Sequence, residues 1–291
     1  EPIAPSAVPL KKRKLFAKPR AMKGKEIEEI IDRYVRTAVL AKEVGFTGVQ
    51  FHAAHGYLLN QFLSPRTNLR TDEWGGSMEK RGRVLLTIVE RARKELGADF
   101  PICVKLNSAD FQRGGFQEDD ALWVIKQLED RGLDLLEISG GTYENLKFFT
   151  EEYEKKASTK AREAYFLDFA KKVRAHSKLP LMVTGGFRTR AFCEEVLESG
   201  ELDMVGFGRP VLLDQRFPAG FLDASLDQVE SIFLKGIPRQ ILDIAEAGWY
   251  DYQIHQLAKG RSHSMNYSGL IATLRFTNNE LVKGIRNRIW G

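Results

Sequence analysis

Residues 47–76 read TGVQFHAAHGYLLNQFLSPRTNLRTDEWGG, and this stretch decides the fold. Its first five residues form a short, largely apolar run that predicts a buried β-strand. His52, His55 and Tyr57 follow that run within six residues. If the strand lies in a parallel sheet, these side chains lie at its carboxyl end, where parallel α/β folds place their chemistry. We therefore expect the rest of the chain to build a sheet around this edge.

Helical and strand patterns alternate along the rest of the chain. Apolar residues at helical spacing predict helices ending near Gly45, Gly97, Gly132 and Gly200, and Ser77 can cap the second of them. A further helix is predicted around residues 165–173. Short apolar runs predict strands at 101–106, 133–139, 180–183 and 203–207. This alternation is typical of a parallel α/β fold, and continuously apolar strands are typical of a sheet covered on both faces.

Five predicted strands fit two parallel architectures. A doubly wound open sheet can be built from five strands, whereas a closed (β/α)8 barrel needs eight. A dinucleotide-binding sheet would place a Gly-x-Gly-x-x-Gly turn where this chain has the His52 segment. The glycine-rich turns come last instead, as phosphate sites in barrels do. We therefore expect an α/β fold of the (β/α)8 TIM-type barrel class, of which this chain carries the last five strands and lacks the first three βα units.

This expectation divides the chain into three parts. Residues 1–24 form an irregular lead-in rich in proline, residues 25–215 form the barrel portion, and residues 216–291 form a C-terminal helical extension. The chain begins at Glu1 without a methionine, which suggests a processed, truncated or partly reported protein.

Composition is typical of soluble globular proteins, because 43% of the 291 residues are hydrophobic and 29% are charged. No apolar run approaches the roughly 20 residues that cross a bilayer. The net charge is +5, and the basic run Lys11-Lys12-Arg13-Lys14 is interpreted as a solvated tail. We therefore expect neither nucleic acid nor a membrane as a partner. Cys103 and Cys193 are too few for a four-cysteine iron–sulfur cluster and are interpreted as core residues of a cytoplasmic protein.

His52, His55 and Tyr57 are the first candidates for chemistry. Two imidazoles three residues apart can converge on one small ligand, and neutral imidazoles can donate hydrogen bonds that polarise a carbonyl or phenolate oxygen. Tyr57 can hand a proton to a carbanion-like centre. One alternative is two structural histidines with Tyr57 as a wall, and another is a metal site, for which no third ligand is obvious. The clustering of three protonatable groups favours function.

Lys105 is predicted near the end of its strand, so its ammonium should point to the same edge of the sheet. A cation there can stabilise an anionic ring system or an enolate, and a salt bridge to a neighbouring acid is the structural alternative. Gly140 and Gly141 would let the backbone approach a bound ring, although an ordinary tight turn explains them nearly as well.

A phosphate site is predicted at the ends of the last two strands. Gly185, Gly186 and Gly208 supply backbone N–H groups, and Arg209 can bind a phosphate through two nitrogens. One glycine pair would be weak support, but two on consecutive final strands, one followed by arginine, form a stronger pattern.

Together these residues resemble the Old Yellow Enzyme family of FMN-dependent NAD(P)H:flavin oxidoreductases, or ene-reductases. The resemblance rests on residues 52–65 (HAAHGYLLNQFLSP), 68–77 (NLRTDEWGGS), the glycine pair at 185–186, and 206–209 (GFGR). It covers roughly residues 1–260, and its first block is long enough to be specific. The spacing of the two histidines resembles the His-x-x-His branch of the family.

The resemblance implies a mechanism and a substrate class. FMN would lie at the C-terminal mouth of the barrel, NAD(P)H would reduce it and leave, and a small α,β-unsaturated carbonyl compound would follow. His52 and His55 would bind the substrate carbonyl oxygen, with His52 also near the flavin. Tyr57 would donate a proton to the α-carbon, opposite the hydride that the β-carbon receives.

The resemblance also implies which residues hold the cofactor. Gly185, Gly186, Gly208 and Arg209 would bind the FMN phosphate. Lys105 stands where the family commonly has an arginine near flavin N1 and the C2 oxygen, so the charge is kept and the fork geometry is lost. The flavin potential is therefore the property that this substitution should change.

Three hypotheses follow from the missing first strands. The native protein includes them and is an active flavoenzyme; or the chain is a truncated, catalytically inactive barrel with a binding or scaffolding role; or it is a phosphate-binding isomerase or aldolase using Lys105 as a Schiff-base amine. The sequence leaves open the physiological enone, the choice between NADH and NADPH, and whether the protein forms a homo-oligomer.

Overall fold

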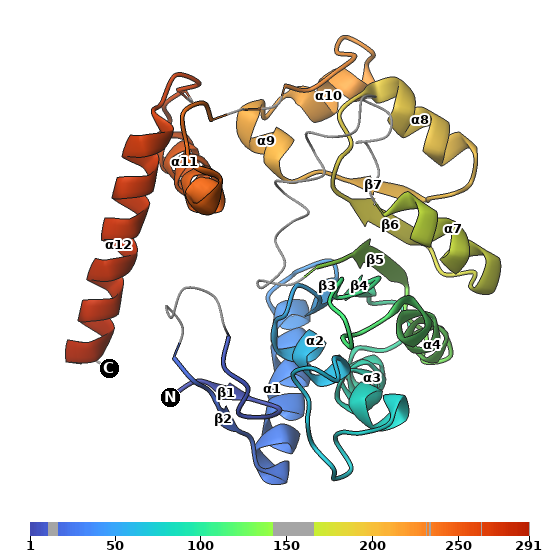
Figure 1. Cartoon of the computed structure of the whole chain (residues 1–291). Helices are drawn as coiled ribbons and strands as arrows, with labels where there is room; N and C mark the ends of the chain where they lie inside the picture. Colours follow the sequence, from blue (N-terminus) through green and yellow to red (C-terminus); the bar gives the residue numbers. More distant parts are fainter. Residues whose placement is uncertain (11–16, 142–165, 231, 233, 263, 291) are drawn as a thin grey trace. The chain divides into compact units, whose positions relative to one another are not determined.

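The structure is a computed structural model that describes residues 1–10, 17–141, 166–230, 232, 234–262 and 264–290 (Figure 1). Two predicted features, the basic run at 11–14 and Tyr165 in the fourth predicted helix, lie outside these residues. The chain divides into two compact units. The first contains the described residues up to 141 together with 166–185 and 195–206, and the second contains 186–194 and the described residues from 207 onward.

The first unit is built on a five-stranded parallel sheet. Its strands are β3 (Val49–Ala53), β4 (Ile102–Asn107), β5 (Leu135–Ser139), β6 (Leu181–Thr184) and β7 (Met204–Gly206). They pair in that order, and every pair is parallel. The five predicted strands are thus confirmed. In a doubly wound sheet the strand order reverses at one point. Here it does not reverse, so the winding is that of a (β/α)8 barrel.

Helices alternate with these strands along the chain. The four longest described helices of the first unit are α1 (Gly24–Glu43), α3 (Met78–Leu96), α4 (Glu118–Glu129) and α7 (Leu167–His176). Helix α1 packs on α3, α3 on α4, and α4 on α7. Each helix buries an apolar stripe, and alternate strand side chains such as Phe51, Val104, Leu136 and Val183 are fully buried against this layer. The apolar core of the first unit lies between helices and sheet.

The second face of the sheet is polar and partly open. The cross-strand register places Gln50, His52, Cys103, Lys105, Asn107, Glu137, Ser139 and Met182 on it, and we call this set the inner face. Gln50 is exposed, and His52, Cys103, Lys105 and Met182 are half-buried. The prediction of a sheet covered on both faces is therefore wrong for the described residues. Cys193 is buried as predicted, whereas Cys103 is only half-buried because it faces this side.

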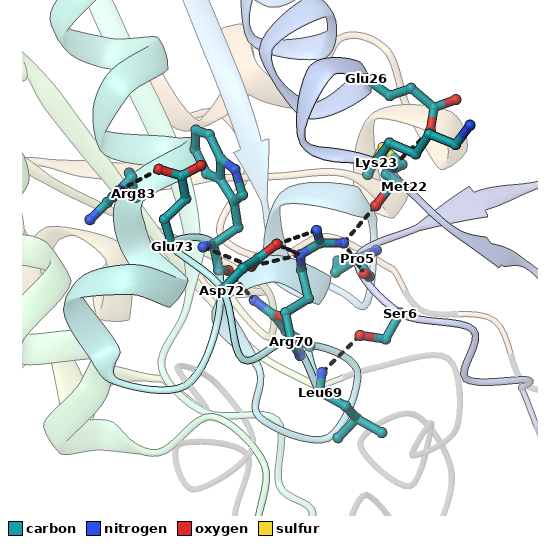
Figure 2. A network of polar contacts seen from close by, with 12 residues as sticks. Pro5, Ser6, Met22, Lys23, Glu26, Leu69, Arg70, Asp72, Glu73 and Arg83 are labelled. Carbon is teal, nitrogen blue, oxygen red and sulfur yellow. Dashed lines mark hydrogen bonds and ion pairs between the residues drawn. The ribbon is translucent and has the colours of Figure 1, made fainter.

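The lead-in is more regular than predicted. Its strand β1 (Ile3–Ala4) pairs in parallel with β2 (Arg20–Ala21). Arg70 holds both segments, since its guanidinium donates hydrogen bonds to the carbonyl of Pro5 at 3.0 Å and that of Met22 at 2.6 Å (Figure 2). The backbone N–H of Leu69 donates to the Ser6 hydroxyl at 2.9 Å.

The second half of the 47–76 stretch forms this clamp. Asp72 accepts hydrogen bonds from the Arg70 guanidinium and from the backbone N–H of Trp74 (Figure 2). Asn68 is buried and donates to the carbonyls of Phe62 and Trp74, both at 2.8 Å. Residues 68–76 therefore have a structural task that is separate from the chemistry predicted for residues 52–57.

The second unit is mainly helical. It contains α9 (Arg209–Leu213), α10 (Phe217–Leu222), the 3-10 helix η1 (Arg239–Ile241), α11 (Leu242–Leu257) and α12 (Gly269–Trp290), and the division between the units falls within α8 (Arg190–Glu198). Helix α11 packs on α12, with Trp249 buried between them. Helices are thus found in the predicted C-terminal extension, while the predicted domain boundaries stay a prediction. No described helix is long and apolar enough to cross a membrane.

Candidate active site

The candidate site lies where β3 leaves the sheet. Strand β3 runs two residues further than predicted, so His52 belongs to the strand, and His55 and Tyr57 lie in the turn before α2 (Leu58–Leu63). His55 has a φ of 60°, a left-handed conformation that is uncommon outside glycine and often marks a functional position. The helix that follows anchors the turn, because Leu59 and Phe62 are buried.

The three predicted groups are close together. The His52 and His55 rings lie with centroids 5.2 Å apart, and the Tyr57 ring centroid is 4.9 Å from that of His52. Tyr57 is 44% exposed, so its phenol can reach solvent or a ligand. The structure therefore brings together the trio that the sequence singled out, and the chemical roles of its members stay predictions.

A buried polar network holds His55. Its backbone N–H donates to Oδ1 of Asn107 at 3.1 Å, and its Nε2 is 2.6 Å from the hydroxyl oxygen of Ser139. Asn107 is fully buried and donates in turn to the carbonyl of Gly141 at 2.9 Å. Asn107 and Ser139 were not among the residues predicted from the sequence. Their signal is positional, since each is the last residue of the strand that contains it.

Both imidazoles are held neutral. Burial, followed by the charge of Lys105, lowers the pKa of His52. Burial lowers the pKa of His55 to about 4, with further lowering by Lys105 and by His52. Both rings are therefore neutral near pH 7, the form in which an imidazole donates one hydrogen bond and accepts another.

One buried ring nitrogen of the site lacks a hydrogen-bond partner in the described part of the chain. Nδ1 of His52 has no hydrogen-bond partner among the described residues, although a buried polar atom normally has one. An unpaired buried nitrogen beside a second imidazole is an attachment point for a polar ligand atom. The residues of the first unit thus fit a ligand that offers a hydrogen-bonding oxygen or nitrogen at the inner face.

Lys105 forms an ion pair with Glu137, an acid that was not predicted as part of the site. Its Nζ lies 2.7 Å from Oε1 of Glu137 on the neighbouring strand, and the two side chains are 20% and 6% exposed. The salt bridge proposed as the structural alternative for Lys105 is thus present. Glu137 could have been noticed as the single acid within the apolar part of the 133–139 run, but only the strand register shows that it faces Lys105.

The space beside Gly140 is filled by the protein itself. A Cβ added at Gly140 would lie 2.6 Å from the Phe111 ring and 2.8 Å from the Phe166 ring. The close approach suggested for this glycine is therefore made by two phenylalanine side chains.

The glycines predicted to bind phosphate lie in turns with positive φ angles or at the start of a helix. Gly185 and Gly186 have φ angles of 124° and 90°, and Gly208 directly precedes α9. Nη1 of Arg209 lies 3.5 Å from Oε2 of Glu246 on α11. Burial raises the pKa of the Glu246 carboxyl, and the charge of Arg209 acts in the opposite direction. Arg209 belongs to the second unit and His52 to the first, so the prediction that one cofactor spans both stays a prediction.

A metal site finds no support in the part of the chain that the structure describes. No group of three or more histidine, cysteine, aspartate or glutamate side chains there could hold a metal ion.

Comparisons with protein families match residues 1–221 to the NADH:flavin oxidoreductase / NADH oxidase family. Among curated proteins, the NADH-dependent flavin oxidoreductase iliE of Neonectria sp. (strain DH2) is 40% identical over 232 residues, covering 74% of this chain and 30% of that protein. The NADPH dehydrogenase of Bacillus subtilis (strain 168) is 31% identical over 215 residues, covering 74% of this chain and 59% of that protein. The chain thus spans between about a third and three-fifths of these relatives.

Solved structures give the same picture. The 2-naphthoyl-CoA reductase complex superposes with a TM-score of 0.69 at 31% identity, covering 77% of this chain and 33% of that one. The old yellow enzyme homologue from Zymomonas mobilis superposes with a TM-score of 0.62 at 28% identity, covering 80% of this chain and 64% of that one.

Proposed function

Because this chain belongs to the NADH:flavin oxidoreductase / NADH oxidase family, we propose that it forms part of an FMN-dependent oxidoreductase that uses NAD(P)H to reduce the C=C bond of α,β-unsaturated carbonyl compounds. The observation that carries the proposal is the pair of neutral imidazoles beside Tyr57, with the unpaired nitrogen of His52. The names of the relatives support NADH or NADPH as the reductant. A cytoplasmic location and a small enone as substrate belong to the same proposal.

The two imidazoles bind and polarise the carbonyl group. The ring N–H groups of His52 and His55 donate hydrogen bonds to the carbonyl oxygen and stabilise the negative charge that develops on it. This makes the β-carbon electrophilic. Because the Ser139 hydroxyl engages Nε2 of His55, an incoming oxygen either displaces that hydroxyl or bonds to Nδ1. Neutral rings suit this task, since each keeps one N–H for the substrate over a wide pH range.

Tyr57 completes the addition across the double bond. When bound, FMN supplies the hydride that reaches the β-carbon. Tyr57 gives its phenolic proton to the α-carbon, and its open position lets solvent return a proton to the phenolate oxygen. Hydride and proton together convert the C=C bond into a single bond.

The remaining predicted residues would hold the cofactor. The Lys105 ammonium suits the acceptor atoms of the flavin ring, and the backbone N–H groups of Gly185, Gly186 and Gly208 suit its phosphate, together with Arg209. Arg209 would then divide its charge between the phosphate and Glu246, which lies 3.5 Å away.

The test begins with the spectrum of the purified chain mixed with FMN. We expect bound, yellow flavin that NADH or NADPH bleaches without oxygen and that an enone restores. Tyr57→Phe should slow the restoration by about 100-fold or more and leave the bleaching unchanged, because only the enone step needs its proton. Tyr34→Phe is the matched control, since Tyr34 lies on α1 against Phe51.

Two outcomes would favour the other hypotheses. A colourless chain that oxidises no NADPH would support a binding or scaffolding role. Trapping of Lys105 by borohydride with a carbonyl substrate would support the Schiff-base enzyme, although Glu137 already engages that amine as an ion pair.

A further inference from the structure

Glu137 and Lys105 form an ion pair in the middle of the inner face. The Lys105 ammonium donates a hydrogen bond to Glu137 at 2.7 Å, and only 4% of the surface of the whole Glu137 residue is exposed. A carboxylate this deeply buried is costly unless a cation and hydrogen bonds compensate it, and a packed apolar pair would be at least as stable. Stability alone is therefore a poor reason for these two residues.

The strand register puts the pair beside the candidate site. His52 on β3 is the direct neighbour of Lys105 on β4, and Lys105 is the direct neighbour of Glu137 on β5. Adjacent strands are about 4.8 Å apart, so the three side chains form one row on the inner face. Lys105 occupies the middle position of this row, and its ammonium bonds to the Glu137 carboxylate.

The pair acts on both imidazoles with opposite signs. Lys105 lowers the pKa of His52 and of His55, whereas Glu137 raises both. In the described part of the chain, Lys105 and Glu137 are the two charged side chains that shift the pKa of both rings, and His52 also lowers the pKa of His55. Tyr57 packs against His52. Without the carboxylate, the rings would face an uncompensated cation at close range.

We infer that Glu137 is a positioning residue that holds the Lys105 ammonium on the inner face next to the candidate site and balances its charge, so that the site offers a fixed cation to a bound flavin. The inference deepens the proposed function and rests on it for the identity of the ligand. The geometry of the row does not depend on that identity.

A three-variant cycle tests this role in the full chain. The variants are Lys105→Gln, Glu137→Gln and the double substitution, and the readout is the titration of the histidine Cε1–H signals by NMR, which needs no flavin. Lys105→Gln should raise the midpoints of His52 and His55 by about half a pH unit or more, because a nearby carboxylate is left alone. Glu137→Gln should lower them, and the double variant should return them close to wild type.

His176 is the internal control, because it is exposed and its Nδ1 contacts its own helix at the Lys172 carbonyl. Its Cε1–H signal should behave alike in the wild type and in all three variants. In flavin-loaded protein, the reduction midpoint should rise in Glu137→Gln and fall in Lys105→Gln, since a free cation stabilises the reduced, anionic flavin. If Glu137→Gln does not fold, Lys105→Gln and the double variant still decide.

Three results would each overturn the inference. The midpoints of His52 and His55 could move in the same direction in both single variants, they could stay where they are, or they could remain shifted in the double variant. A purely structural ion pair predicts loss of stability without this alternation of sign. If the titrations alternate as expected but the chain binds no flavin, the positioning role stands and the proposed function fails.

Discussion

His55 combines an unfavourable backbone conformation with a dense set of partners. A left-handed non-glycine residue costs about 1–3 kcal/mol, and such residues persist where their surroundings over-determine them. Asn107 fixes the backbone of His55 and Ser139 fixes its ring, and both are buried. The ring is thus set in place before any ligand arrives, which is what a hydrogen-bond donor needs if it is to act without reorganisation.

The depressed pKa of His55 predicts a loss of stability in weak acid. The folded ring has a pKa of about 4 and an unfolded histidine about 6.5, so the unfolded chain binds a proton that the folded one does not between these values. Stability should therefore fall as the pH falls from about 6.5 to about 4, by about 1–2 kcal/mol after allowance for solvent screening. Urea unfolding at pH 7 and pH 5 measures this.

The control for this prediction is His55→Asn, which removes the titrating ring. Its free energy of unfolding should change less between pH 7 and pH 5 than that of the wild type, whereas exposed His176→Asn should behave like the wild type. An equal acid-induced loss in wild type and His55→Asn would mean that other groups cause it.

Spacing alone indicated His52, His55 and Tyr57, because three protonatable groups in six residues stand out in any sequence. Glu137, Asn107 and Ser139 could not be found in that way. Each is a single polar residue in an apolar strand, and its meaning depends on which face it occupies and what the neighbouring strand presents there. Such information comes only from the strand register, which hydropathy along the chain does not give.

Strand β3 shows why the boundaries shifted. The apolar run stops at His52, but the ladder continues, since His52 pairs with Lys105 and Ala53 with Leu106. The inner face accepts polar side chains because it is half-open, so hydropathy falls while the hydrogen bonds persist. The helices were easier to predict, because their apolar stripes face a continuous core.

The loop at 68–76 predicts a steric requirement at Gly75. A Cβ there would lie 2.5 Å from Cβ of Arg70, 2.6 Å from its carbonyl oxygen and 2.7 Å from Oδ1 of Asn68. Gly75→Ala should therefore displace the clamp that holds the lead-in and destabilise the chain by about 1–3 kcal/mol. Thermal unfolding measures the loss, and limited proteolysis should show earlier cleavage in the lead-in.

Gly24→Ala is the matched control for the clamp. Its added Cβ would meet only Nε1 of Trp74, at an ordinary 3.8 Å, and alanine is the better helix former at the first residue of α1. The control should be neutral or slightly stabilising. Equal losses in Gly24→Ala and Gly75→Ala would show that the loop tolerates a side chain at Gly75.

The winding of the chain followed from the sequence because each βα unit lies beside the next. Consecutive units that pair in order need no long-range information, and the strand order bears this out. The second unit was harder to predict. Helix α11 has apolar residues around its circumference, so its pattern does not indicate which side meets α12, and Trp249 gives no hint of its partner until the fold is known.

The free edge of the sheet has a consequence for the chain in solution. Among the described residues, β3 pairs only with β4, so its other edge keeps unpaired backbone groups. A groove of about 480 Å³ runs along it, lined by residues of α1 and β3 and by Phe46, which is 64% exposed. An open strand edge that is flanked by apolar surface tends to form a sheet with a strand of another chain.

We therefore predict that the chain purified by itself self-associates through this edge. Phe46→Glu should shift sedimentation-velocity profiles toward the monomer across a concentration series, with little change in thermal stability, because the replaced ring is mostly exposed. Leu69→Glu is the matched control: Leu69 is 63% exposed in the same unit but lies on the 68–76 loop, away from the groove. If both substitutions reduced association equally, general surface hydrophobicity would be the cause, and the free β3 edge would have no special role in it.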